Sequence, residues 1–348
     1  MGLIDKSGSF SQYTTITDLP GDFLEIIADR IRHNAFVKIN EDTIQERSAG
    51  WVNISNLLDN TFEDMSFLKE PYIAMSLRVD DRKVPVEALK RYCLEEEERV
   101  KTEQNIDFLP KNRRNTIKEM VKLRLLKRVI PSSKTHDMIW NYETGRLIFA
   151  STNTKLCDEF QDKFLKTFNV DTNTMHPAMV GSQLLEENGI SKNIADKFTY
   201  IENAGADFLT WLWHRVNKQN NAFDFNDGTA QIWFDEKVVL QQGSSDNMET
   251  VTCIGDSQSM TEIKSALEEQ KKIIQTKLVV ISDDKEWSFT LDATYLDFKS
   301  LKTPKVIQDK TDPDGTFYEK IYLIEDIINI VNTIYTVFVL EYTDKMKG

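Results

Sequence analysis

The sequence predicts an α+β fold in which antiparallel sheets pack against helices. Residues 72–79 alternate between apolar and polar side chains, which is typical of a half-buried strand. Residues 136–151 contain two apolar stretches around Gly145 and predict a β-hairpin, and a helix with aromatic residues on one face follows it. Hairpin-plus-helix units recur in both halves of the 348-residue chain, which is long enough to bury one large core or two to three subdomains.

The N-terminal part, residues 1–84, combines strands with one amphipathic helix. Residues 10–16 predict a strand, and residues 22–33 predict a helix whose isoleucines share one face. The strand at residues 72–79 follows, so this part is a small α+β unit.

Residues 85–130 predict two helices of opposite charge. Pro85 suits the first turn of a helix that runs to about residue 102 and includes four consecutive glutamates. Residues 104–110 interrupt it, and a second helix runs over about residues 113–129. The apolar stripe of this second helix comprises Ile117, Met120, Val121 and Leu125. An acidic helix joined to a basic one by a short break predicts an antiparallel hairpin that projects from the body of the protein.

The rest of the chain predicts two further α+β parts, residues 131–216 and 217–348. The first contains the hairpin at 136–151, the aromatic helix after it and a short helix at 207–216. The elements expected in the second are a loop at 217–228, a strand at 231–240, an exposed loop at 243–257, a helix at 260–274, two strands within 277–291 around Asp283-Asp284, and an apolar helix at 317–340.

Positive charge is concentrated in residues 111–134, KNRRNTIKEMVKLRLLKRVIPSSK. This segment holds nine Lys or Arg residues and one Glu, a local charge of +8 in a chain whose net charge is −13. The rest of the chain therefore carries −21 and disfavours indiscriminate binding of polyanions. The segment is either a face that binds a polyanion or a solvated helix face that balances its acidic neighbours, and charge alone leaves both open.

The sequence contains no motif of a catalytic, metal or cofactor site, so we expect neither enzymatic activity nor a cofactor. The four histidines are far apart and fit no metal-ligand spacing. Walker A, GxGxxG and GxSxG motifs are absent. Asp80 and Asp81, followed by Lys83, form the best candidate for a nuclease-like metal site, but this pattern is more typical of the polar end of a strand.

Cysteine usage and hydropathy predict an intracellular protein. Cys93, Cys157 and Cys253 are widely spaced and odd in number, which suits reduced thiols better than disulfides. The N-terminus lacks the apolar core of a signal peptide. The most apolar stretch, residues 321–340, contains two carboxylates and predicts a buried or interface helix. We therefore expect a cytoplasmic protein without a membrane partner.

A colinear series of short motifs resembles the recombination-associated protein RdgC family. The order and spacing of these motifs hold over roughly residues 50–340, and the shared order carries the resemblance. The motifs are Gly50-Trp51-Val52, Lys83-Val84-Pro85, Val129-Ile130-Pro131, Trp140 followed by Gly145-Arg146-Leu147 and Ala150-Ser151, Leu209-Thr210-Trp211-Leu212, and Glu262-Ile263 through Lys271 with Thr276-Lys277-Leu278.

The resemblance implies an elongated protomer of several subdomains in a homodimer that closes into a ring around double-stranded DNA. It also implies sequence-independent binding, association with the nucleoid, and restraint of RecA-type recombinase filaments without enzymatic turnover. These implications agree with confined positive charge and with the absence of a catalytic motif. Lys and Arg side chains that contact phosphates supply affinity without reading bases.

The DNA-binding residues that we expect on this basis are all cations. Those of the basic segment are Lys111, Arg113, Arg114, Lys118, Lys122, Arg124, Lys127, Arg128 and Lys134. The resemblance adds Lys271, which matches the lysine of a family motif, with Lys272 as a one-residue alternative.

Two departures from the family pattern motivate a second interpretation. Residues 132–135, SSKT, stand where the family carries a basic residue and an aromatic residue that can wedge at DNA, and residues 254–258 replace a basic stretch. The alternative function is a protein-interaction scaffold of the same fold that has lost DNA binding. In that interpretation the acidic surface and the C-terminal helix bind a protein partner, and the basic helix pairs with Glu95 to Glu98.

Overall fold

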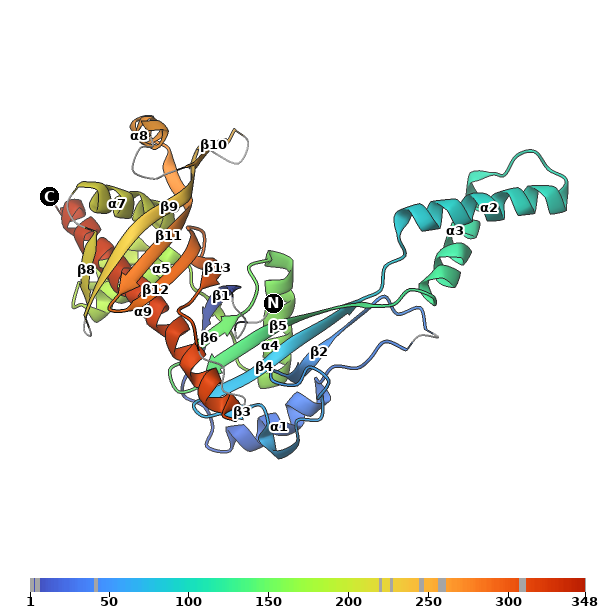
Figure 1. The fold of residues 1–348 in the computed structure, drawn as a ribbon, viewed down its shortest axis with the longest axis horizontal. Coiled ribbons are helices and arrows are strands. Elements are labelled where there is room, and N and C mark those ends of the chain that lie inside the picture. The colour runs from blue at the N-terminus through green and yellow to red at the C-terminus, as the bar shows by residue number, and fades with distance from the viewer. Residues whose placement is uncertain are drawn as a thin grey trace. The chain divides into compact units, whose positions relative to one another are not determined.

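The computed structural model describes residues 3, 7–40, 43–218, 221–225, 228–243, 247–255, 261–306 and 311–347. Within them the chain forms nine α-helices and a large antiparallel sheet (Figure 1), which confirms the predicted α+β class. The chain divides into two compact units. The larger unit comprises Met1–Thr17, Ile139–Leu165 and Val170–Gly348, and the smaller unit comprises Asp18–Met138 and Lys166–Asn169. The finer division into four parts stays a prediction.

The larger unit contains most of the strands and the longest helix. Its strands are β1 (Gly8–Thr14), β6 (Arg146–Phe149), β7 (Asn173–Thr174), β8 (Ala222–Phe225), β9 (Gly228–Gln242), β10 (Glu249–Ile254), β11 (Lys272–Ser282), β12 (Lys285–Asp292) and β13 (Asp297–Lys302). Its helices are α5 (Pro177–Glu187), α6 (Lys192–Phe198), α7 (Ala204–Lys218), α8 (Thr261–Glu268) and α9 (Pro313–Lys347).

The smaller unit contains three helices and a short sheet. Its elements are α1 (Phe23–His33), β2 (Arg47–Asn53), a 3-10 turn (Glu63–Met65), β3 (Leu68–Lys69), β4 (Tyr72–Asp81), α2 (Val86–Gln104) and α3 (Lys111–Leu126). Two elements contain residues of both units, namely β5 (Ser132–Asn141) and α4 (Thr154–Phe168).

β11 is a central strand of the larger unit, where the strand order is β10-β9-β11-β12-β13-β1-β6. It pairs antiparallel with β9 on one side and with β12 on the other. Leu278 and Val280 are buried while Val279 between them is half-buried, because successive side chains of a strand point to opposite faces. On β12, buried Trp287 donates a hydrogen bond of 3.0 Å from Nε1 to the carbonyl oxygen of Leu323, which fastens α9 to this sheet.

α9 contains the apolar helix that the sequence predicts at residues 317–340 and extends it in both directions. It is long and apolar enough to cross a membrane, by length and composition alone, and 56% of its apolar stretch is buried inside the fold. The buried hydroxyl of Tyr335 donates a hydrogen bond of 2.6 Å to the carbonyl oxygen of Pro177 at the start of α5. Much of α9 is therefore a core helix of the larger unit.

Three expectations for the second half were wrong. Residues 249–254 form β10 rather than an exposed loop, because the segment is rich in β-branched residues and pairs with β9. Residues 244–246 and 256–257 of that predicted loop lie outside the described residues. The helix expected at 260–274 ends at Glu268, since Gln270 has a φ of 65° that reverses the chain into β11. The loop expected at 217–228 contains β8, which pairs with β9.

Gly50 and Trp51 lie at a tight backbone contact in the smaller unit. Trp51 is fully buried, packs on Phe168, and donates a hydrogen bond of 2.9 Å from Nε1 to the hydroxyl of Thr167. A Cβ atom added at Gly50 would overlap the backbone of Phe36. Glycine at this position therefore allows the close approach that seats Trp51.

We expect Gly50→Ala to destabilise the smaller unit by about 1–3 kcal/mol, because the added methyl group overlaps backbone that cannot rotate away. Chemical denaturation measures this change. Gly21→Ala is the control, since nothing lies within 4 Å of a Cβ atom there and its stability should be unchanged. Equal stability of the Gly50→Ala and natural chains would contradict the close packing.

Asp297 is a buried carboxyl group near Ser11, Tyr13 and Cys157 in the larger unit. Burial raises the pKa of Asp297 to about 6, a hydrogen bond from Ser11 opposes the shift, and the charge of Asp292 adds to it. Because this pKa is higher in the folded chain than in the unfolded chain, ionised Asp297 disfavours folding above pH 6. The cost disappears below about pH 4, where the carboxyl is protonated in both states.

Asp297→Asn should therefore raise the free energy of unfolding at pH 8 by up to about 3 kcal/mol, since each pKa unit corresponds to about 1.4 kcal/mol. The gain should shrink as the pH falls from 6 to 4, which denaturation at a series of pH values would show. Asp292→Asn is the matched control with the opposite sign. Burial opposes ionisation of Asp292 as well, but a hydrogen bond from Lys299 holds its pKa below the usual value. A pH-independent effect of Asp297→Asn would contradict the assignment.

Candidate functional site

The basic surface, as we use the term, consists of α3 and residues 127–134 after it in the smaller unit. Ile117, Val121 and Leu125 are buried and pack with Leu109 against α2. Met120, which we expected in this apolar stripe, is 52% exposed, because it lies about 100° around the helix from Val121. The buried stripe fixes which sides of α3 remain in contact with solvent.

The cations of α3 flank its buried stripe in two rows. Lys111, Arg114, Lys118 and Lys122 recur every three or four residues and therefore share one side of the helix. Arg113 and Arg124 are three turns apart and share the other side. Positive charge therefore lies along both edges of the packed face of α3.

Three of the predicted cations have partners within the smaller unit. Lys122 Nζ lies 2.6 Å from Glu46 Oε1, and Arg124 Nη1 lies 3.5 Å from Glu96 Oε2. The guanidinium of Arg114 lies 5.9 Å from the centre of the Phe108 ring. Both ion pairs are partly solvent-exposed, so each contributes only about 0–1 kcal/mol.

Six predicted cations are exposed and have no ion pair with any carboxylate of the described residues. They are Lys111, Arg113, Lys118, Lys127, Arg128 and Lys134. A polyanion can bind these cations without breaking an ion pair to a described carboxylate. Its attraction to them is therefore not reduced by the loss of an existing interaction. The first five lie on or directly after α3, with Lys111 and Lys118 on one side of the helix and Arg113 on the other, and Lys134 lies in β5.

Lys271 and Lys272 belong to the larger unit and already have ion-pair partners there. Lys271 is 6% exposed, and its Nζ lies 2.7 Å from Glu269 Oε2 and 3.3 Å from Glu249 Oε2. The hydrogen bond to Glu269 raises the pKa of Lys271. Lys272 Nζ lies 2.6 Å from Asp207 Oδ1. A phosphate contact at either lysine requires these pairs to separate, which makes both weaker candidates than the exposed cations.

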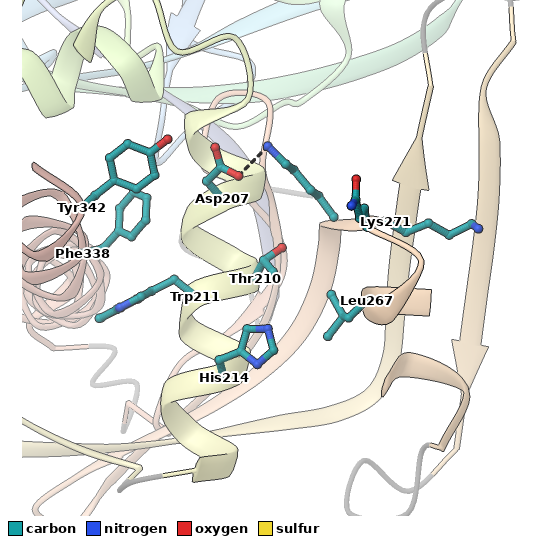
Figure 2. A pocket seen from close by; sticks show the side chains of 10 residues that line it. Asp207, Thr210, Trp211, His214, Leu267, Lys271, Phe338 and Tyr342 are labelled. Atoms are coloured by element: carbon teal, nitrogen blue, oxygen red, sulfur yellow. Dashed lines mark ion pairs between the residues drawn. The ribbon is translucent and has the colours of Figure 1, made fainter. Parts of the chain in front are cut away.

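These two lysines line an open cleft over one face of α7 (Figure 2). Asp207, Thr210, Trp211 and His214 of α7 line its floor, with Phe338 and Tyr342 of α9 on one side and Leu267 and Lys271 on the other. Gln270 completes the lining. The cleft has a volume of about 570 Å³. The four α7 residues follow the i, i+3, i+4, i+7 pattern, which is the signal in the sequence that they share one helical face.

Polar side chains of the α7 cleft form hydrogen bonds that join α7 to β11 and to α9. The hydroxyl of Thr210 accepts a hydrogen bond of 3.0 Å from the backbone amide of Ile273, and Trp211 Nε1 donates one of 2.9 Å to Glu341 Oε2. Thr210 and Trp211 belong to one of the motifs that carry the family resemblance, and these contacts give them a structural role.

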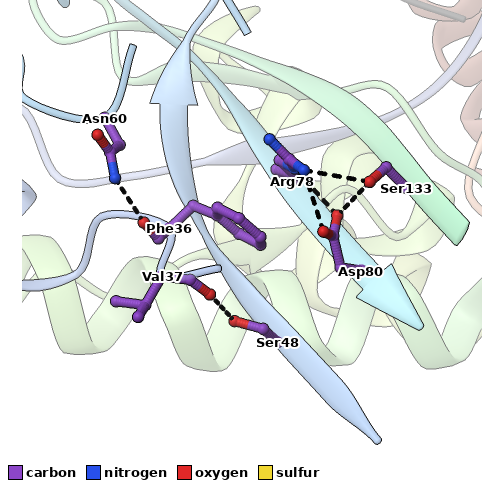
Figure 3. Close-up of polar contacts among 7 residues, drawn as sticks. All are labelled: Phe36, Val37, Ser48, Asn60, Arg78, Asp80 and Ser133. Atoms are coloured by element: carbon purple, nitrogen blue, oxygen red, sulfur yellow. Dashed lines mark hydrogen bonds and ion pairs between the residues drawn. The ribbon is translucent and has the colours of Figure 1, made fainter. Parts of the chain in front are cut away.

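Asp80 and Asp81 do not form a shared metal site. Asp80 accepts hydrogen bonds of 2.9 and 3.0 Å from Arg78 and another from Ser133 (Figure 3). Burial favours its neutral form, but the bonds from Arg78 and Ser133 hold the pKa of Asp80 below its usual value. Asp81 lies 2.6 Å from Arg47. Because successive residues of a strand point to opposite faces, the two carboxylates diverge.

Metal-ligating side chains do not gather elsewhere in the part of the chain that the structure describes, where no group of three His, Cys, Asp or Glu residues could hold an ion. No protein-family model matches this chain, and no curated protein matches its sequence. The resemblance of the short motifs to the RdgC family therefore stays a prediction.

Proposed function

We propose that the protein binds double-stranded DNA without sequence preference and without catalysis, through the basic surface of α3 and the segment after it. The observation that carries the proposal is the set of six exposed cations that have no ion pair with a described carboxylate, in a chain whose net charge is −13. Phosphate is the ligand that such a surface suits, because the acidic remainder of the chain disfavours contacts elsewhere.

The helical rows suit a regularly charged polymer. Lys111 and Lys122, the ends of one row, are eleven residues apart, which is about 17 Å along the axis of α3. Duplex DNA presents phosphates on each strand at about 3.4 Å per base pair, so this row spans about five base pairs. Lys and Arg contacts of this kind position a protein on the backbone and carry no sequence information.

The wider proposal follows the RdgC resemblance. In it, two protomers form a ring, the charged hairpin of α2 and α3 projects so that its basic surface lines the hole, and bound DNA is withheld from RecA-type recombinase filaments. The proposed location is the cytoplasm, on the nucleoid. No step of this function requires a cofactor or bond cleavage.

The protein-interaction scaffold is the second candidate, and one contact favours it. Arg124 pairs with Glu96, one of the four consecutive glutamates of α2, so part of the basic charge is balanced inside the helix pair. In that function a partner would remain bound after the exposed cations are neutralised, whereas DNA would not.

We expect Lys118→Gln, Lys127→Gln and Arg128→Gln together to weaken binding of a fluorescent DNA duplex. If six phosphates are contacted, log affinity falls with log salt at a slope of about −5, and loss of three contacts reduces it to about −3. Fluorescence anisotropy at several salt concentrations measures both slopes.

The matched control is Lys155→Gln, Lys192→Gln and Lys197→Gln, three exposed lysines of the larger unit that change the net charge equally. This control should retain the affinity and slope of the natural chain. Equal losses in both triple variants would mean that net charge alone, rather than the basic surface, determines binding. No binding of the natural chain at low salt would favour the scaffold.

The ring requires a dimer, so light scattering at micromolar concentration should give twice the chain mass of 40.3 kDa. The measurement is made with and without DNA, because a ring that closes only on DNA gives the doubled mass in the second sample alone. A mass of one chain in both samples would exclude the ring while leaving DNA binding by a single protomer open.

A further inference from the structure

A groove runs between α2 and α3, which contact each other; in Figure 1 α3 passes behind α2. It has a volume of about 550 Å³. The residues that α2 contributes follow the i, i+3, i+4, i+7 pattern of one helical face: Val86, Leu89, Lys90, Cys93, Leu94 and Glu97. From Val86 to Glu97 this stripe covers about 17 Å, or three helical turns.

The floor of the groove is apolar and only partly covered. Leu89 and Cys93 pack against the buried cluster of Ile117, Val121 and Leu125, so they belong to the helix contact. Val86 is 77% exposed and Leu94 is 55% exposed. Two large apolar side chains therefore face solvent at the same groove, next to half-buried neighbours that extend the apolar area.

The rim of the groove is positive. Lys90 on α2 and Lys111, Arg114 and Lys118 on α3 line it, and Glu97 is the one carboxylate among the ten residues that do so. Among the other glutamates of α2, all except the exposed Glu87 have cationic partners on α2. Ion pairs along α2 join Arg91 to Glu95, Arg99 to Glu96 and Glu103, and Lys101 to Glu98. The excess positive charge therefore remains at the groove.

We infer that this groove binds an acidic amphipathic helix from another protein. Apolar side chains of that helix, spaced three and four residues apart, pack on Val86 and Leu94, and its flanking Asp or Glu side chains pair with the cations of the rim. Recognition of an amphipathic helix in an apolar groove uses this spacing generally. Three exposed turns match a helix of about 12 to 16 residues.

The apolar floor distinguishes this partner from DNA. A phosphate backbone gains from the four cations but gains nothing from Val86 and Leu94, whose exposed surface would stay in water. A neutral apolar helix would cover the floor but leave the positive rim unpaired. Only a partner that is both apolar on one face and acidic beside it satisfies both features. Binding of such a helix does not require DNA binding, although Lys111, Arg114 and Lys118 line the groove and also belong to the basic surface.

The experiment uses the full chain and a synthetic peptide probe of about 16 residues, with Leu on one helical face and Glu beside it. We expect saturable binding by fluorescence anisotropy, and at least tenfold weaker binding of a scrambled peptide of equal composition. A probe with Lys in place of Glu should not bind at the same concentration. Equal affinity for the scrambled peptide would overturn the proposal, since charge alone would then explain it.

Val86→Ser with Leu94→Ser should weaken the acidic probe at least tenfold and leave DNA binding unchanged. The matched control is Met120→Ser with Leu123→Ser, which removes two similarly exposed apolar side chains of α3 that do not line the groove. This control should bind the probe as the natural chain does. Equal losses in both double variants would overturn the groove as the binding site.

A second readout needs no substitution and so does not depend on how a variant folds. Cys93 is a free thiol that lines the groove, whereas Cys157 lies in the larger unit. Saturating probe should slow alkylation of Cys93 at least fivefold, measured by mass spectrometry, without slowing that of Cys157. Unprotected Cys93 under saturating probe would place the peptide elsewhere. Protection of Cys93 by duplex DNA without binding of the acidic probe would overturn the proposal in favour of DNA.

Discussion

The packing of α3 on α2 is the constraint on which both proposed surfaces depend. Ile117, Val121 and Leu125 recur every four residues, so burying them against α2 sets the rotation of α3 about its axis. Because Cβ directions are fixed by the helix, every cation of α3 then has a determined side. A rotation of α3 by a quarter turn would bury one cationic row and expose the apolar stripe.

Local neutralisation explains how a chain of net charge −13 retains usable positive charge. Carboxylates of α2 pair mainly with Arg and Lys residues one turn away on α2 itself, and Glu96 alone reaches across to Arg124. In the larger unit, Lys271 and Lys272 lie against three carboxylates. Screening at about 8 Å in physiological salt limits what distant acidic residues contribute at α3. The short distances, rather than the net charge, decide which cations can meet an anion.

Periodicity predicted the helices well, and the α+β class followed from them, because amphipathic stripes such as that of α3 are local patterns. Whether a charged side chain is paired or exposed in the folded chain was not predictable in this way. Lys271 and Lys118 look alike in sequence, yet Lys271 is enclosed by the nearby Glu269 and by Glu249 of β10, whereas Lys118 is exposed. β10 was missed because its pairing with β9 outweighs a Gly- and Ser-rich context. The groove at Val86 was not predicted, because the run of four glutamates made α2 look like an acidic helix without an apolar surface.

Three cations belong to both proposed surfaces, namely Lys111, Arg114 and Lys118. A carboxylate of a bound helix and a phosphate of bound DNA compete for the same ammonium or guanidinium group. Each ligand therefore weakens the binding of the other. Linkage makes this opposition reciprocal: the factor by which the acidic helix weakens DNA equals the factor by which DNA weakens the helix. Lys127, Arg128 and Lys134 do not line the groove and can keep contact with phosphate while the helix is bound. An acidic amphipathic partner would therefore loosen DNA on this surface and leave part of the electrostatic attraction in place, which is the behaviour of a regulator rather than of a simple competitor.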